Sequence, residues 1–419
     1  MMYGLLGEHL GHSFSCEIHR RIGDYPYTLC EVAPSDVAAF LAREDYHAVN
    51  VTIPYKETVI PYLSELAPVA AEIGAVNTVV RRDGKLIGYN TDFDGMRALI
   101  ERLAVPVKGK KALVLGTGGT SLTASAVLRA LGAAPILRVG RSGKDGSLTY
   151  EEAISAHSDA EVLINTTPVG MYPNSDGIPV DLALFPRLSL VADAVYNPLR
   201  TNLVLAARAR GIPAAGGLYM LVAQAVSAAA HFGTLTDDPA PLTARIYGEL
   251  CHEKENIVLV GMPGSGKTTV GRALAVREGR PFIDLDEEIV REAGKSIPEI
   301  FAACGEAGFR DIEVGVLKKV ASQHTGAVIS TGGGAILREE NRNALHRSGR
   351  VYFLDRPLET ILPTASRPLS SDREALEARY RERYPLYLGT ADCRIPVTEG
   401  DVEGTVLSIL ADFSASYDF

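Results

Sequence analysis

Short apolar segments alternate with amphipathic segments along most of the chain. In the first hundred residues, the runs 2–6, 47–53 and 75–80 are apolar and predict strands, whereas 16–22 predicts a helix. Strand-to-loop passages follow at 110–119, 135–142, 161–168 and 190–198, and the apolar stretch 218–230 predicts another helix. Such alternation is typical of α/β folds with doubly wound, largely parallel sheets.

The second half repeats this pattern around a glycine-rich loop. An apolar strand is predicted at 256–260 and a helix over 269–274, and between them lies GMPGSGKT at 261–268, which satisfies G-x-x-x-x-G-K-[ST]. In such a P-loop, backbone N–H groups and a helix N-terminus face phosphates, a lysine adds charge, and a hydroxyl binds Mg²⁺. The residues predicted to bind ATP are Gly261, Gly264, Ser265, Gly266, Lys267 and Thr268, with Thr268 also a metal ligand.

The length of 419 residues suggests two or three domains. We predict a substrate domain at 1–103 completed by 218–247, a Rossmann nucleotide-binding domain at 104–217, and a P-loop domain with a parallel sheet at 254–419. A last helix of the first part is expected over 242–251, with residues 252–255 as a very short linker.

Charge and cysteine content narrow the functional classes. The formal net charge of −9 argues against nucleic acid as a partner. Five cysteines, odd in number and without a C-x-x-C pair, indicate neither a disulfide framework nor a zinc site. The N-terminus lacks a basic start and an apolar core, and the most apolar run is interrupted by Gln224 and Ser227. We therefore expect a soluble cytoplasmic protein that acts on small molecules and not at a membrane.

Polar residues gather where the predicted strands of the first domain end. Carboxyl ends of strands are the usual ligand edge of open α/β sheets. Taken alone, Ser15 is equally well explained as an N-cap of the following helix, and Lys56 as a solvated lysine. The polar residues are Ser13, Ser15, Asn50, Thr52, Lys56, Asn77, Asn90, Thr91 and Asp92.

A glycine turn follows the strand near residue 115. The glycines Gly116, Gly118 and Gly119 resemble a dinucleotide fingerprint, although its last position is Ser121. After the next strand, Arg141 and Ser142 stand where an acidic residue would hold the ribose of NAD, so Arg141 favours the 2′-phosphate of NADP. An ordinary exposed arginine is the alternative. Gly217 is assigned to the same cofactor site.

Further candidates lie in the P-loop domain. Asp284 and Asp286 end a predicted strand at 281–286 on one face, where one carboxylate could reach Mg²⁺ and the other a substrate hydroxyl. Arg310 lies at the start of a predicted helix, and Arg383 lies in a later predicted helix. A strand at 326–331 leads into Gly332, Gly333 and Gly334, where a bare backbone allows close approach to a ligand. Solvated arginines, a capping aspartate and a plain loop are the alternatives.

Residues 1–247 resemble shikimate dehydrogenases in the order and spacing of these motifs. The matching segments are Ser13-x-Ser15, Asn50 to Lys56, Gly74 to Thr78, Asn90 to Asp92, Gly116 to Gly119, Arg141-Ser142 and Leu221 to Ala225. The resemblance implies reduction of 3-dehydroshikimate with NADPH and a catalytic pair of Lys56 and Asp92. It also implies substrate contacts from Ser13, Ser15, Thr52, Asn77, Tyr196 and Gln224.

Residues 254–419 resemble shikimate kinases. The matching motifs are the P-loop, Asp284-x-Asp286, Gly308-Phe309-Arg310, Thr331 to Gly334, Arg367-Pro368-Leu369 and Arg383 before Pro385-Leu386-Tyr387. The resemblance implies that Asp286 is the catalytic base, that Arg310 and Arg383 bind the substrate carboxylate, and that Arg367 comes over the phosphates from a lid. The lid at 362–367 departs from the family because it is short and lacks a further upstream arginine.

The two resemblances support each other because the product of the first reaction is the substrate of the second. We therefore expect a bifunctional enzyme of the shikimate pathway that uses NADP(H), ATP and Mg²⁺. Two alternatives remain. One accepts quinate as well as shikimate, or NAD as cofactor; the other is a ligand-sensing protein built from decayed enzyme halves.

Overall fold

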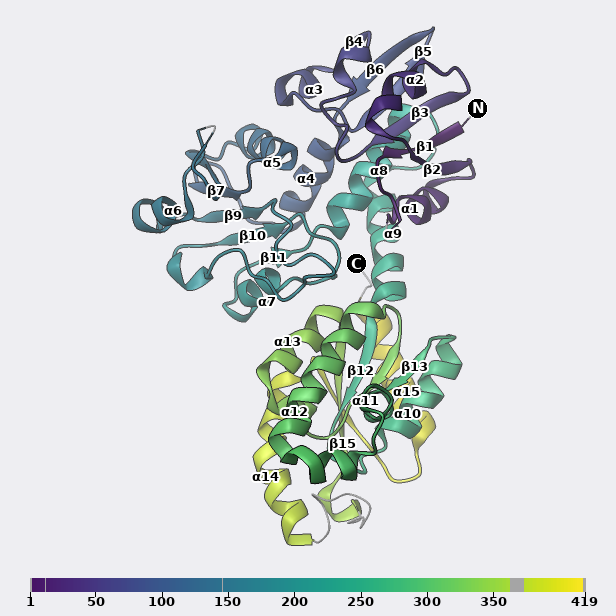
Figure 1. Cartoon of the computed structure of the whole chain (residues 1–419), viewed down its shortest axis with the longest axis vertical. Helices are drawn as coiled ribbons and strands as arrows, with labels where there is room; N and C mark the ends of the chain where they lie inside the picture. The colour runs from purple at the N-terminus through teal and green to yellow at the C-terminus, as the bar shows by residue number, and fades with distance from the viewer. Residues whose placement is uncertain (1, 12, 145, 362–372, 417–419) are drawn as a thin grey trace. The chain divides into compact units, whose positions relative to one another are not determined.

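The computed structural model describes residues 2–11, 13–144, 146–361 and 373–416. The chain divides into two compact units (Figure 1). The first contains most residues up to Tyr247, and the second contains 198–202 together with the residues from Gly248 onward.

The first unit begins with a mixed six-stranded sheet in the order β2-β1-β3-β5-β6-β4. β1, β2 and β3 are parallel, whereas β5 runs antiparallel to both β3 and β6. Apolar side chains of helices and strands, including Leu6, Val49 and Val79, form its core. The strands are β1 Met2–Gly7, β2 Tyr27–Glu31, β3 Tyr46–Val51, β4 Glu65–Leu66, β5 Thr78–Arg82 and β6 Lys85–Tyr89. Its helices are α1 Ser15–Ile22, α2 Val37–Ala42 and α3 Pro68–Ile73.

A second sheet in the same unit has five parallel strands in the order β11-β10-β9-β7-β8. Alternate residues of its strands face two separate cores: Leu113 and Leu163 face one, and Val114 and Ile164 the other. Such burial on both faces is typical of a doubly wound sheet. The strands are β7 Ala112–Leu115, β8 Ile136–Val139, β9 Val162–Asn165, β10 Leu190–Asp193 and β11 Ala214–Ala215. The helices are α5 Gly119–Ala130, α6 Tyr150–His157 and α7 Asn202–Ala209.

Two packed helices, α4 Thr91–Arg102 and α8 Leu218–Phe232, lie between these two sheets (Figure 1). Gly95 of α4 lets them approach closely, because a Cβ there would lie 2.5 Å from the Met220 carbonyl oxygen. The catalytic candidate Asp92 and the substrate candidate Gln224 are therefore carried by neighbouring helices.

The second unit contains a parallel five-stranded sheet in the order β13-β14-β12-β15-β16, as expected for a P-loop fold. Val258 and Val260 of the central strand face one core, and Ile257 and Leu259 face the other. The strands are β12 Asn256–Val260, β13 Phe282–Asp284, β14 Val328–Ser330, β15 Gly349–Asp355 and β16 Cys393–Pro396. The helices are α10 Lys267–Glu278, α11 Leu285–Ala293, α12 Ile297–Gln323, α13 Glu339–Ser348, α14 Arg373–Thr390 and α15 Val402–Ala415.

The structure corrects three local predictions. Residues 252–254, predicted as part of a linker after a helix that ends at 251, instead continue helix α9, which extends over Pro239–Lys254 and leaves only Glu255 before β12. Asp284 and Asp286 do not share a strand face, since Asp286 already lies in the first turn of α11. Ser15 is not the N-cap of α1; Phe14 holds that position, and Ser15 is the first helical residue.

Among the described residues, no helix is both long and apolar enough to cross a membrane.

Candidate functional site

A cavity of about 580 Å³ opens in the first unit between residues of its two sheets. All substrate-contact candidates of this unit line it, together with both members of the predicted catalytic pair. These are Ser13, Ser15, Thr52, Lys56, Asn77, Asp92, Tyr196 and Gln224. Residues from widely separated parts of the chain thus meet where strands β1, β3 and β10 end.

Lys56 and Asp92 form an ion pair in the lining of this cavity. Lys56 Nζ lies 2.5 Å from Asp92 Oδ2, and the two side chains are 22% and 12% exposed. Lys56 comes from the turn after β3, and Asp92 from the first turn of α4. Asn90 caps that helix by accepting a hydrogen bond from the Phe93 N–H at 3.2 Å. The cap fixes the helix start, and with it the Asp92 carboxylate.

Asn77 and Gln224 are held in defined orientations next to this pair. The buried Asn77 Oδ1 accepts from the backbone N–H of Thr91 at 2.7 Å, so its Nδ2 must be the donor to Gln224 Oε1 at 3.5 Å. Gln224 Nε2 donates to the Leu221 carbonyl oxygen at 2.9 Å. Both amides can therefore present fixed donors or acceptors to a ligand's hydroxyl groups.

The two serines lie at the start of α1. Ser13 Oγ accepts from the Ser15 N–H at 3.2 Å and lies 3.0 Å from Ser15 Oγ. Hydroxyls beside a helix N-terminus suit an anionic group such as a carboxylate. Tyr196, from the loop after β10, packs its ring 5.5 Å from Phe14, and burial raises the pKa of its phenol. Tyr196 is therefore a neutral hydrogen-bond donor at neutral pH.

The turn between β7 and α5 fits a dinucleotide. Gly116 has φ +121°, and a Cβ there would lie 2.4 Å from Thr166 Oγ1, so only glycine fits. Gly118 is the N-cap of α5, which begins at Gly119, so the backbone N–H groups of the first helical turn can face a pyrophosphate. Ser121, the departure from the fingerprint, is buried and donates its hydroxyl to the Gly118 carbonyl oxygen at 2.6 Å. It therefore stabilises the turn from within.

The remaining cofactor candidates of the first unit lie at two places. Arg141 and Ser142 follow β8, are exposed and do not line the cavity. Gly217 lines the cavity, and a Cβ there would lie 2.2 Å from the Ala194 carbonyl oxygen. An exposed guanidinium at the end of β8 fits a 2′-phosphate, which is the group that distinguishes NADP from NAD.

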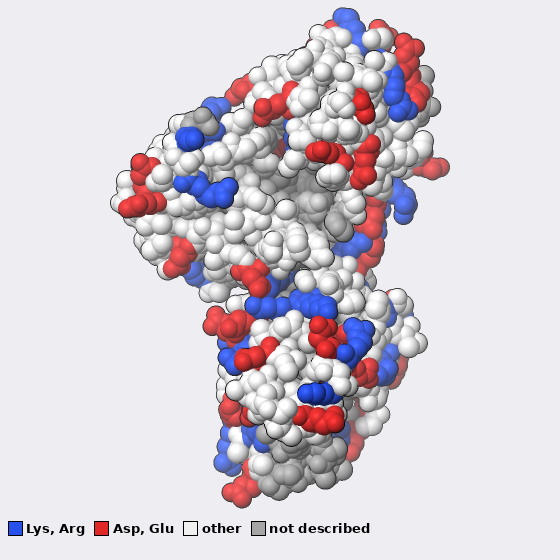
Figure 2. All heavy atoms as spheres, in the orientation of Figure 1, with Lys and Arg blue, Asp and Glu red and all other residues white. Residues whose placement is uncertain are grey.

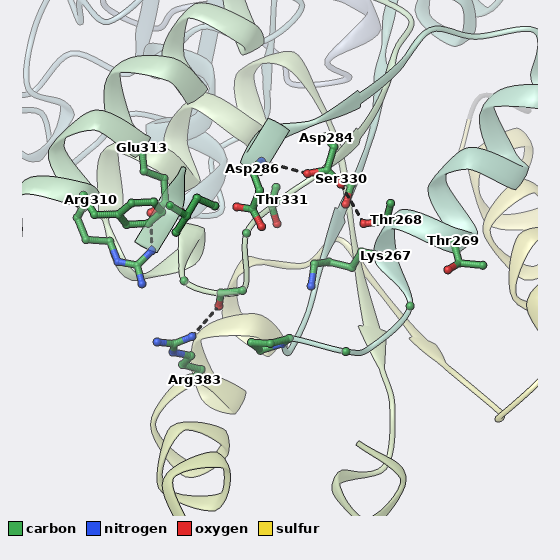
Figure 3. A pocket seen from close by; sticks show the side chains of 18 of the residues that line it. Lys267, Thr268, Thr269, Asp284, Asp286, Arg310, Glu313, Ser330, Thr331 and Arg383 are labelled. Atoms are coloured by element: carbon green, nitrogen blue, oxygen red, sulfur yellow. Dashed lines mark hydrogen bonds and ion pairs between the residues drawn. The ribbon is translucent and has the colours of Figure 1, made fainter. Parts of the chain in front are cut away.

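A second cavity, also about 580 Å³, lies against the P-loop in the second unit (Figure 3). Gly264, Gly266, Lys267 and Thr268 line it, whereas Gly261 and the buried Ser265 form the loop behind. Lys267 Nζ donates to the carbonyl oxygens of Gly261 at 2.9 Å and Met262 at 3.0 Å. The amine is thus held at the mouth of the phosphate cradle.

The residues predicted to bind Mg²⁺ are in contact with each other. Thr268 Oγ1 donates to Asp284 Oδ2 at 2.9 Å, and Asp284 Oδ1 accepts from the Asp286 N–H at 3.1 Å (Figure 3). Among the described residues, no three acidic, histidine or cysteine side chains cluster as a metal site. One hydroxyl and one carboxylate fit Mg²⁺, which completes its shell with waters and phosphate oxygens.

Arg310, Arg383 and three glycines form the other side of this cavity, with Asp286 between them and Lys267 (Figure 3). A side chain on these glycines would displace the neighbouring site residues: a Cβ on Gly334 would lie 2.2 Å from the Arg310 guanidinium, and one on Gly332 would lie 2.8 Å from Asp286 Oδ1. Arg383 Nη1 donates to the Gly333 carbonyl oxygen at 3.2 Å. The predicted carboxylate-binding residues therefore meet beside Asp286.

Glu313 is a site residue that the sequence analysis missed. Its carboxylate accepts from Arg310 Nη1 at 2.8 Å, lines the cavity and is fully buried. Burial raises the pKa of Glu313, and the Arg310 charge opposes that rise. The signal in the sequence was an acid three residues after Arg310, on the same helix face.

Arg367, predicted to act from the lid, lies outside the described residues.

On the visible face of both units, acidic and basic side chains are interspersed (Figure 2). The charges that matter for a small anionic ligand are therefore those inside the two cavities.

Comparisons with known proteins agree with this geometry. A family model for shikimate kinase matches residues 263–413, and one for the shikimate dehydrogenase substrate binding domain matches residues 5–79. The shikimate dehydrogenase (NADP(+)) of Clostridium perfringens strain SM101 is 36% identical over 267 residues, which cover 59% of this chain and 98% of that protein.

Two solved structures match the same part of the chain. A chorismate mutase/shikimate 5-dehydrogenase fusion protein from Clostridium acetobutylicum is 33% identical, with a TM-score of 0.56, over 59% of this chain and 96% of that one. A shikimate 5-dehydrogenase from Thermus thermophilus, in complex with NADP(H) and shikimate, is 28% identical, with a TM-score of 0.53. The match covers 59% of this chain and 99% of that one. This chain belongs to the shikimate dehydrogenase family and carries a shikimate kinase domain after the dehydrogenase part in the sequence. It is a bifunctional enzyme of the shikimate pathway.

Proposed function

We propose that the first cavity reduces 3-dehydroshikimate to shikimate with NADPH, and that the second phosphorylates the 3-hydroxyl of shikimate with MgATP. The observation that carries the first half is the Lys56–Asp92 ion pair inside a cavity rimmed by hydroxyl and amide side chains. The second half is carried by a P-loop that shares one cavity with Asp286, Arg310 and Arg383.

In the reduction, bound NADPH supplies a hydride to the 3-keto carbon of the substrate. Negative charge then develops on the keto oxygen, and the Lys56 ammonium stabilises it and donates the proton that makes the hydroxyl. Asp92 holds the Lys56 amine at 2.5 Å and orients it. Ser13 and Ser15 bind the ring carboxylate, and Thr52, Asn77, Tyr196 and Gln224 bind the hydroxyl groups.

In the phosphorylation, Arg310 and Arg383 hold the shikimate carboxylate at one side of the cavity. This places the 3-hydroxyl near Asp286, which accepts its proton as the oxygen attacks the γ-phosphorus. Lys267 and the P-loop N–H groups stabilise the charge on the transferring phosphoryl group, and Arg367 adds a further positive charge. Mg²⁺ bound near Thr268 and Asp284 would neutralise phosphate oxygens.

The test is a pair of assays on one preparation of the full chain. Shikimate-dependent formation of NADPH from NADP⁺ reports the first activity, and shikimate-dependent formation of ADP from ATP reports the second. We expect both activities, with NADP⁺ turned over faster than NAD⁺ and shikimate faster than quinate. The absence of either activity would refute the assignment of the corresponding cavity.

Two variants make the assignment specific. Lys56→Ala should lower the dehydrogenase rate at least 10³-fold and leave the kinase rate within twofold. The reason is that Lys56 lines the first cavity, whereas the P-loop lysine Lys267 lines the second. Lys267→Ala should have the reverse effect. A single variant that abolished both activities would contradict the separation into two sites. The predicted domain limits and the cytoplasmic location stay predictions.

A further inference from the structure

Arg356 lines the kinase cavity, and none of the motifs described above accounts for it. It directly follows β15, whose residue Phe353 pairs with Val260 at the end of β12. The P-loop leaves the sheet at the same edge, immediately after Val260. Because β12 and β15 are neighbouring parallel strands, Arg356 and the P-loop both follow the same end of the sheet and lie next to each other.

Three contacts position the Arg356 guanidinium. Nη1 donates to the Gly264 carbonyl oxygen of the P-loop at 3.4 Å, and Nε donates to Thr360 Oγ1 at 3.0 Å. Nη2 donates to Glu399 Oε1 at 2.9 Å. Arg356 is 19% exposed, whereas Glu399 is 70% exposed. The arginine is thus ordered at the cavity, and its partner is a solvated carboxylate.

The basic side chains that line the described part of this cavity separate into two pairs by their contacts. Arg310 and Arg383 contact Glu313 and the Gly333 carbonyl oxygen, on the side assigned to the shikimate carboxylate. Lys267 and Arg356 both contact carbonyl oxygens of the P-loop itself. Arg356 therefore belongs to the nucleotide side of the cavity.

A nucleoside triphosphate brings several negative charges to that side. A planar guanidinium forms paired, charge-assisted hydrogen bonds with phosphate oxygens, whereas Arg356 makes a single bond to the exposed Glu399 carboxylate. An ion pair with a solvated glutamate contributes little by itself and is easily exchanged. Glu399 is therefore suited to hold Arg356 until the nucleotide arrives.

We infer that Arg356 is a binding residue for the phosphate chain of the nucleotide, and that Glu399 holds it in position and competes with the phosphates for it. This inference rests on the proposed kinase function of the second unit. It adds to the P-loop a cationic contact from the end of the neighbouring strand.

The experiment measures binding of ADP and of adenosine to the full chain by calorimetry, together with the Michaelis constants of the kinase reaction. For Arg356→Ala we expect the dissociation constant of ADP and the KM for ATP to rise about tenfold. Adenosine binding and the KM for shikimate should change less than twofold. Arg356→Lys should recover part of the loss, because it restores the charge without the planar fork.

Glu399→Gln distinguishes a phosphate contact from a merely structural tie. If Arg356 binds phosphate, ADP should bind this variant at least as tightly as the original chain, since the competing carboxylate is gone. If the ion pair only holds two loops together, Glu399→Gln should weaken ADP binding as Arg356→Ala does, and the inference is overturned. An equal loss of adenosine and ADP affinity in Arg356→Ala would also overturn it.

Arg277→Ala is the matched control, because Arg277 forms an ion pair with Glu403 but does not line the cavity. It should leave every nucleotide constant within twofold. The dehydrogenase rate of each variant reports that the chain is folded. If the unsubstituted chain binds ADP but Arg356→Ala binds it equally well, the inference fails while the kinase function stands. If the unsubstituted chain neither binds ADP nor phosphorylates shikimate, the proposed function itself fails.

Discussion

At the scale of single residues, Glu313 shows how a buried charge can set the geometry of a binding residue. Arg310 has two acidic partners on its own helix, and they differ sharply in environment. Glu313 is fully buried and 2.8 Å from Nη1, whereas Glu306 is 49% exposed and 3.2 Å from Nη2. In a buried pair, removal of one charge leaves the other uncompensated, whereas a solvated pair loses little.

We therefore predict that Glu313→Gln raises the KM for shikimate about tenfold and leaves the KM for ATP within twofold. The substitution preserves the shape of the side chain but removes the charge that orients Arg310. Steady-state kinetics with each substrate varied in turn would measure this. Glu306→Gln is the control and should change neither constant more than twofold; equal effects of the two variants would show that burial is not what matters.

The motifs and the family resemblance named most of the residues that line the two cavities, but not the environment of each residue. Lys56 and Asp92 were assigned together, and the structure places them 2.5 Å apart. Glu313 was missed because its importance comes from burial, and an acid on a helix is ordinarily solvated. Asp286 was placed on a strand because β13 ends at Asp284 and α11 begins at the next residue, Leu285. No glycine or proline marks this change from strand to helix.

At the scale of elements, α12 is two helical segments joined at a glycine. Gly305 has φ +70° and ψ −174°, a conformation that essentially only glycine adopts. The segment after it carries Arg310 and Glu313 in its second and third turns. The break therefore sets the direction of the segment that carries Arg310 and Glu313, both of which line the cavity. The sequence indicated the helix start near Gly308 without revealing that another helix precedes it.

We predict that Gly305→Ala destabilises the second unit by about 1–3 kcal/mol, because alanine cannot adopt this backbone conformation without strain. The shift of the following segment should also raise the KM for shikimate more than the KM for ATP. Denaturant unfolding monitored by kinase activity would measure the first effect.

Gly315 in the same helix provides the matched control. It is exposed, helical and has no atom within 4 Å of its would-be Cβ. Gly315→Ala should stabilise the unit by up to about 1 kcal/mol, since alanine favours helices more than glycine does. If both substitutions had the same sign, backbone strain at Gly305 would not explain the break in α12.

At the scale of the whole molecule, helix α9 runs across the boundary between the two units, with Gly248 as the first residue of its second part. The sequence located both enzymes from their motifs but predicted a linker at 252–255, because four polar or charged residues in succession are typical of exposed connections. The structure instead shows that the last turn of α9 is part of the second unit. Cys251 and Glu255 are buried there, and the Lys254 carbonyl oxygen accepts from the Gly326 N–H at 2.9 Å.

Arg280 adds to this attachment. Its guanidinium donates to the carbonyl oxygens of His252 at 2.6 Å and Glu255 at 2.8 Å. With the bond from Gly326, at least three hydrogen bonds join backbone carbonyl oxygens of residues 252–255 to the rest of the P-loop unit, and each contributes about 1 kcal/mol when both partners are ordered. The polar residues of the junction thus face partners and not only solvent.

We predict that a four-residue Gly-Ser insertion after Lys254 lowers the melting temperature of the second unit by about 6–12 °C, because about 3 kcal/mol of hydrogen bonding is lost in a unit of this size. The same insertion after Thr236, in the exposed loop before α9, should shift it by less than about 2 °C, because a doubling of loop length costs only about 0.6 kcal/mol. Calorimetry of the full chain, with shikimate and ADP added to identify the kinase transition, would measure both shifts. Dehydrogenase activity should be retained in both insertions. Equal tolerance of the two sites would mean that residues 252–255 act as the short linker that their composition suggests.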